Sequence, residues 1–133
     1  MSLLRTADLL ARGAEEAIKP SGLSATQYNV LRILRGAGPE GLCCGEVAER
    51  MLTHDPDITR LLDRLEKRGL VRRARESEDR RVITVRITQE GLRILAKLDE
   101  PIEELHRRQL GHLGQRRLQR LIDLLKSAGV SSG

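Results

Sequence analysis

The sequence predicts a mainly α-helical fold with one small β-wing. Apolar residues recur at intervals of three and four through most of the chain, which is the period of an amphipathic helix. Only in "VITVRI", residues 82–87, do they alternate with a period of two, as in a half-buried strand. The length of 133 residues suits a single domain. We therefore expect one structural unit over residues 1–133.

The first two predicted helices are separated by the helix-breaking segment "KPSG". Residues 1–20 carry an apolar stripe made of Leu3, Leu4, Ala7, Leu10, Ala14 and Ile18. Ser24 can begin the second helix, in a capping box with Gln27. Leu31 and Leu34 continue the buried face of this second helix.

A third and a fourth helix are predicted after a short segment at Leu42 and Cys43. The third helix, "GEVAERML", is expected to bury Val47, Ala48 and Met51, with Leu52 as a further candidate. For the fourth helix we expect Asp55 as the N-cap and Pro56 at the first helical position. Its buried face comprises Ile58, Leu61, Leu62 and Leu65. Gly69 is expected to end this helix.

The second half of the chain predicts a hairpin and two more helices. The runs "VRRAR" and "VITVRI" are expected to pair through the polar tip "ESEDRR". A long helix begins at Thr88, and Pro101 should kink it without ending it, because the apolar pattern continues. Residues 23–88 thus form a helix-turn-helix followed by a wing. The striped helices at 1–20 and 89–129 have no core of their own and should pack against a second copy.

Composition restricts the partner. The net charge is +5 and the pI about 9.9, which allows a polyanionic partner without requiring one. Tyr28 is the single aromatic residue, which argues against single-strand binding by base stacking. No segment is apolar and long enough to span a membrane, and no signal peptide pattern begins the chain, so we expect a cytoplasmic protein.

The chain resembles the MarR (multiple antibiotic resistance regulator) family of winged helix-turn-helix transcription factors. The resemblance rests on "LSATQYNVLRIL", "GEVAERM", "ITRLLDRLEKRGLVRR", "EDRRVITVRIT" and "QEG", which follow one another in family order. It implies a homodimer whose DNA-binding lobes are joined by interlocked terminal helices. It also implies repression of an operon, often relieved by a small aromatic or phenolic ligand, for which we expect a pocket near Tyr28.

The fourth predicted helix also has the properties of a major-groove reader, independently of that resemblance. One apolar face can dock on the domain, while the opposite polar face can reach base edges. An arginine there can bind guanine in a bidentate way. Residues 54–88 hold ten basic and seven acidic residues, so geometry supports this interpretation more than charge does. The residues expected to contact double-stranded DNA are Thr59, Arg60, Arg64, Lys67, Arg72, Arg73, Arg80 and Arg81.

Acidic residues near these arginines have a structural interpretation. We expect Asp63 and Asp79 to support the wing by pairing with arginines, Asp79 with Arg81 at the tip. Asp57 departs from the small polar residue common in the family. It can cap the helix, accept a hydrogen bond from a cytosine amino group, or repel a phosphate.

Metal, redox and catalytic interpretations are weaker. The spacing of His106 and His112 is not that of a helical metal-ligand pair, and no catalytic constellation or cofactor motif is present, so we expect no enzyme, cofactor or metal. Cys43 and Cys44 suggest a redox-sensing regulator, but Glu40 and Glu46 nearby should disfavour their thiolates. The other alternative is a winged-helix module for protein–protein assembly.

Overall fold

The computed structural model describes residues 2–52, 54–55, 57–75 and 82–129. Within them the chain forms six α-helices and three short strands. In chain order these are α1 (Ser2–Ile18), α2 (Ala25–Ala37), β1 (Leu42–Cys43), α3 (Cys44–Arg50), α4 (Ile58–Lys67), β2 (Val71–Ala74), β3 (Thr84–Ile87), α5 (Gln89–Leu110) and α6 (Gly114–Gly129). This order confirms the predicted mainly helical fold with a small wing.

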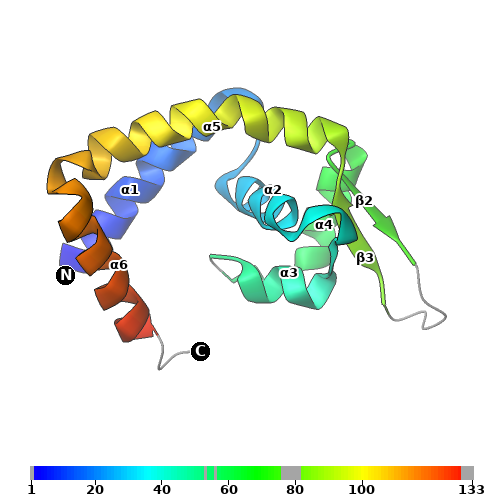
Figure 1. Ribbon diagram of the computed structural model, residues 1–133. Helices are drawn as coiled ribbons and strands as arrows, with labels where there is room; N and C mark the ends of the chain where they lie inside the picture. Colours follow the sequence, from blue (N-terminus) through cyan, green and yellow to red (C-terminus); the bar gives the residue numbers. More distant parts are fainter. Residues whose placement is uncertain (1, 53, 56, 76–81, 130–133) are drawn as a thin grey trace.

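The long helix α5 connects two parts of the molecule (Figure 1). Helices α2, α3 and α4 and the strands lie at and below one of its ends, while α1 and α6 lie at the other. The three strands form one antiparallel sheet in the order β1-β3-β2. Val71 pairs with Ile87 and Leu42 pairs with Val85. We call the part that holds α2, α3, α4 and the strands the lobe, and the part that holds α1 and α6 the stalk.

The start of α2 agrees with the prediction. Ser24 donates its backbone N–H to the Gln27 side chain at 3.0 Å, and Gln27 N–H donates to Ser24 Oγ at 3.1 Å. The two bonds satisfy amide groups that the first turn of a helix leaves without partners. Gly22, with a φ of 77°, makes the preceding left-handed turn at little conformational cost.

Helix α3 is shorter than expected. It ends at Arg50, because the backbone of Met51 is extended. Val47 is fully buried as predicted, but Ala48 is exposed and Leu52 is 86% exposed. The prediction was wrong for Leu52 because it continued the helical period beyond the last helical turn, and wrong for Ala48 because this residue of α3 lies on the exposed side of the helix.

The N-cap of α4 is Asp57 and not the predicted Asp55. Asp57 accepts the Arg60 backbone N–H at 3.0 Å, and Asp55 accepts the Asp57 N–H at 2.8 Å. Asp55 thus shapes the turn before the helix, while Pro56 lies outside the described residues. Gly69, with a φ of 74°, follows the helix as predicted.

Helix α5 starts at the predicted cap and continues through Pro101. Thr88 accepts the Gly91 N–H at 3.1 Å. A Cβ on Gly91 would lie 2.5 Å from the Leu70 carbonyl oxygen, so this glycine permits α5 to pack closely on the end of the lobe. No helix in the described part of the chain is long and apolar enough to cross a bilayer.

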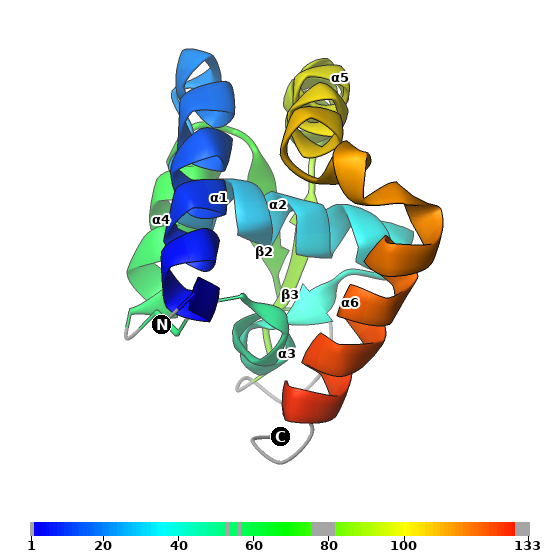
Figure 2. The same cartoon turned by 90° about the vertical axis from the view of Figure 1, so that its left-hand side faces the viewer.

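A single apolar core joins the lobe to α5. Its fully buried members include residues of α2, α3, α4, the strands and α5, namely Val30, Leu31, Leu34, Val47, Leu62, Leu65, Val85 and Leu95. Helix α6 has no buried residue among those described, and α1 buries only Ile18. The turned view in Figure 2 shows α1 and α6 on opposite sides of the molecule, with α2 between them and α5 above.

Candidate nucleic-acid interface

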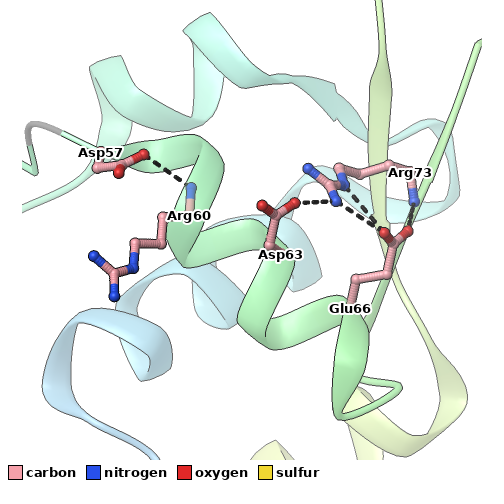
Figure 3. Close-up of polar contacts among 5 residues, drawn as sticks. All are labelled: Asp57, Arg60, Asp63, Glu66 and Arg73. Atoms are coloured by element: carbon pink, nitrogen blue, oxygen red, sulfur yellow. Dashed lines mark hydrogen bonds and ion pairs between the residues drawn. The ribbon is translucent and has the colours of Figure 1, made fainter.

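The outer face of α4 is polar and exposed, while its inner face is apolar and buried. Leu61, Leu62 and Leu65 are at most 8% exposed. The exposed side chains of the helix include Thr59, Arg60, Arg64 and Lys67, which are the four predicted contacts on this helix. Figure 3 shows the Arg60 side chain pointing away from the helix axis and away from the wing. Such a helix can dock through one face and present cations through the other.

Helix α4 is held by polar contacts at both ends. Asp57 caps its N-terminus, which supports the capping interpretation of this departure from the family pattern. At its C-terminus, Arg68 donates to the carbonyl oxygens of Gly22 at 3.1 Å and Ser21 at 3.2 Å. These carbonyls belong to the turn between α1 and α2. The helix therefore cannot rotate about its axis without breaking contacts to the rest of the lobe.

Arg73 of β2 connects the wing to α4 (Figure 3). Its guanidinium donates to Glu66 Oε1 at 2.9 Å and also to Asp63, while its backbone N–H donates to Glu66 Oε2 at 2.9 Å. The Arg73 side chain is 21% exposed. Sequence reasoning anticipated an arginine partner for Asp63 but missed this positioning role of Arg73, which it assigned to DNA. As a phosphate contact Arg73 remains a prediction.

The Arg73 cluster sets the ionisation of Glu66. The hydrogen bond from the Arg73 backbone N–H, and then those from its side chain, lower the pKa of the Glu66 carboxyl below its ordinary value. Glu66 therefore remains a carboxylate acceptor at acidities where a free glutamate would be partly protonated. Strand β2 is thus attached to α4 by a charged contact that needs an ionised carboxylate.

Arg72 and the wing tip account for the other predicted contacts. Arg72 is exposed and stands opposite Arg86 in the β2–β3 register. Arg86 Nε donates to the Pro39 carbonyl oxygen at 2.8 Å. The predicted tip residues Asp79, Arg80 and Arg81 lie outside the described residues.

The cysteines lie at the junction of β1 and α3. Both are half-buried and reduced. Burial is the main cause that raises the pKa of the Cys44 thiol, and Arg73 partly opposes it. The predicted direction for Cys44 is therefore right, but desolvation is the main cause in place of the acidic neighbours. A raised pKa leaves little reactive thiolate at neutral pH.

A second feature is an open cavity of about 610 Å³ between the lobe and the stalk. Tyr28 of α2 lines it, together with residues of α1, α5 and the segment after α3. Arg32 lies over the Tyr28 ring, with 5.9 Å between its Cζ and the ring centroid. Arg50 and His106 also line the cavity. Among the described residues no group of three or more His, Cys, Asp and Glu side chains is suited to a metal ion.

Comparison with known proteins identifies the family. The MarR family model matches residues 23–83. A MarR transcription factor from Planctomyces limnophilus is 48% identical, with a TM-score of 0.73, over 93% of this chain and 90% of the other. The chain belongs to the MarR family. It is a DNA-binding transcriptional regulator, in a family that is not enzymatic. The resemblance inferred from the sequence is thereby confirmed.

Two further relatives connect this fold to DNA and to repression. A mutant of Escherichia coli MarR in complex with operator DNA is 25% identical, with a TM-score of 0.84, over 95% of this chain and 89% of the other. The transcriptional repressor IacR of Pseudomonas putida is 30% identical over 124 residues, which are 93% of this chain and 73% of IacR.

One structural relative was solved with a small molecule. NadR in complex with 4-hydroxyphenylacetate is 26% identical to the chain, with a TM-score of 0.80. The match covers 96% of this chain and 89% of NadR.

The depressed pKa of Glu66 predicts how acid affects stability. A group whose pKa is lowered by folding stabilises the folded state above its unfolded pKa, and this contribution is lost as pH falls through the folded pKa. Glu66→Gln removes this contribution. We therefore expect the free energy of unfolding to fall less steeply in Glu66→Gln than in the wild type between about pH 6 and about pH 3.

Urea unfolding at one protein concentration measures this dependence. Arg73→Gln serves as the graded comparison, because the backbone N–H of residue 73 still donates to Glu66. The pH dependence of the free energy of unfolding of Arg73→Gln should lie between those of Glu66→Gln and the wild type. If the free energy of unfolding fell equally steeply with pH in the wild type and in Glu66→Gln, the role given to the contact between Glu66 and Arg73 would be contradicted.

Proposed function

We propose that the protein is a homodimeric repressor that binds a pseudo-palindromic operator through α4 and the wing. The observation that carries this proposal is the exposure of Thr59, Arg60 and Arg64 on a helix whose opposite face is buried. Arg60 and Arg64 lie one helical turn apart and can reach neighbouring base edges. The relatives that bind operator DNA or act as repressors support the proposal.

The apolar faces of the terminal helices support a second copy as the partner. Leu3, Leu4 and Leu9 of α1 are 62–70% exposed. Leu124 and Leu125 of α6 are 56% and 46% exposed. A monomer would leave these side chains in water, whereas a two-fold pairing of the stalks would bury them. In this proposal residues 23–88 bind DNA, and the segments 1–20 and 89–129 supply the dimer interface through the exposed leucines of α1 and α6.

The phosphate contacts lie around the reading helix. Lys67 and Arg72 are exposed, so both can reach a phosphate oxygen. Arg80 and Arg81 are proposed to contact phosphates or a narrow minor groove. Asp79 would orient Arg81 at the wing tip. These contacts would fix the protein on the duplex, while Arg60 and Arg64 would discriminate between sequences.

The cavity suits a small aromatic or phenolic acid that relieves repression. Its wall combines apolar residues of α1, Ile102 of α5 and the Tyr28 ring with the cations Arg32 and Arg50. The ring of such an acid can pack on the apolar surface while its carboxylate forms an ion pair with an arginine. The NadR complex with 4-hydroxyphenylacetate supports this ligand class. The cavity lies between the two parts of the molecule, where an occupant can change their relative orientation.

DNA binding by two variants tests the proposed division of contacts. Arg64→Ala should lose about 1–3 kcal/mol of binding free energy on the operator, because a base contact is lost. It should also relax the base preference at one position of each half-site. Arg72→Ala should weaken binding to all duplexes and reduce the salt slope by roughly one unit, because a phosphate contact is lost. The operator is first selected from genomic fragments, and affinities are then measured at several salt concentrations.

Arg93→Ala is the control for these variants. Arg93 is an exposed arginine paired with Glu90 at the start of α5. It is not among the proposed DNA contacts, and it is on neither of the two helices whose exposed leucines are proposed to pair. It should bind like the wild type. Wild-type binding that does not depend on salt would favour the protein–protein assembly alternative. Wild-type affinity in Arg64→Ala would remove that residue from the interface.

Tyr28 offers a direct test of the ligand proposal, because it is the single aromatic residue of the chain. In an NMR spectrum of protein labelled only at tyrosine, all labelled ring resonances come from Tyr28 and report on the cavity. Titration with 4-hydroxyphenylacetate should shift these resonances and lower operator affinity. Arg32→Ala should weaken both effects, because one of the cations that line the cavity is removed. Unshifted resonances at millimolar probe would contradict this ligand class.

A further inference from the structure

A bidentate ion pair joins α2 of the lobe to the long connecting helix α5. Arg35, near the end of α2, donates Nη1 to Asp99 Oδ2 at 2.9 Å and Nη2 to Asp99 Oδ1 at 3.0 Å. The two residues are 64 positions apart in the sequence. The hydrogen bonds that the Arg35 side chain donates to Asp99 raise the pKa of the guanidinium.

This ion pair stands close to the proline inside α5. Pro101 lacks a backbone N–H and cannot donate to the carbonyl of Lys97, so one helical hydrogen bond is absent two residues beyond Asp99. On the N-terminal side of this point, Gly91 and Leu95 pack in the lobe. On its C-terminal side, Gln109 donates to the Leu10 carbonyl oxygen of α1 at 3.4 Å. The helix therefore changes packing partners close to the ion pair.

Apolar side chains also join α2 to α5. Leu31 and Leu34 of α2 share one core with Leu95 and Leu98 of α5. Packing of apolar side chains between two helices restricts their crossing angle only to within about 15–20°. A planar guanidinium facing a carboxylate through two parallel hydrogen bonds is directional. The Arg35 and Asp99 side chains are 31% and 42% exposed, so their contribution to stability is small.

We propose that Arg35 and Asp99 are positioning residues that set the angle between the lobe and α5, and thereby the operator spacing that a dimer accepts. This inference rests on the proposed homodimer with two reading helices. In such a dimer a small rotation of each lobe moves both α4 helices and changes the distance between the major grooves they can enter together. Binding of one lobe to a half-site does not depend on this angle.

The test compares a full operator with a single half-site in the variant Arg35→Lys. Lysine keeps the charge but loses the two-pronged geometry. The affinity of Arg35→Lys for the full operator should fall about tenfold or more. Misaligned lobes cannot bind both half-sites at once, so the added affinity of simultaneous binding is lost. Its affinity for a duplex with one half-site should stay within about twofold of the wild type. Operators whose half-sites are moved apart or together by one base pair should show a changed spacing preference.

Two further variants separate positioning from stability. The reversed pair Arg35→Asp with Asp99→Arg restores a bidentate contact and should recover the spacing preference. Arg93→Lys changes an exposed arginine whose pair with Glu90 lies within α5, so it should behave like the wild type. Thermal unfolding of each variant is followed in parallel.

The outcomes distinguish the inference from the function on which it rests. If the wild type binds the full operator no more tightly than the half-site, the two-site proposal itself fails. If the wild type prefers the full operator and Arg35→Lys retains that preference and spacing, the positioning role is wrong. Equal losses of Arg35→Lys on full and half-sites, with a lowered melting temperature, would also overturn it by showing a role in stability alone.

Discussion

Burial of Leu62 and Leu65 beneath α4 determines which side chains of this helix remain available to DNA. Both are fully buried, and each such side chain contributes about 1.5–3 kcal/mol relative to exposure in water. A different rotation of the helix would expose these leucines to water and bury arginines without partners. Both changes would lower the free energy of unfolding. The exposure of Arg60 and Arg64 therefore follows from the packing on the other side of the helix.

Charged contacts in this molecule provide direction, whereas apolar contacts provide most of the stability. Arg73 holds the wing against α4 through Glu66, and Arg35 holds α2 against α5 through Asp99. Each is partly exposed, so the free energy that each contributes to folding is modest. Their geometry nevertheless orients rigid elements relative to one another. In the proposed dimer, which must match two surfaces to one duplex, this orientation matters more than the added stability.

The predictability of the structure from the sequence ends where contacts become non-local. The buried face of α4 and the Ser24–Gln27 capping box were predictable because both depend on spacing within a few residues. The sequence left Asp55 and Asp57 as candidate caps of α4, because the two are chemically equivalent and only the turn geometry decides between them. The pairing of Arg73 with Glu66 depends on how the wing packs on the helix, which no local pattern records.

Methylation protection on the selected operator tests the central claim most directly, because it reports on guanine N7 in the major groove. Two α4 helices related by a two-fold axis should protect guanines in two clusters about one helical turn apart, or a multiple of that distance, on opposite strands. Arg64→Ala should lose protection at one position in each cluster while the others persist. Protection in a single cluster, or none in the major groove, would contradict a dimer that reads DNA through α4.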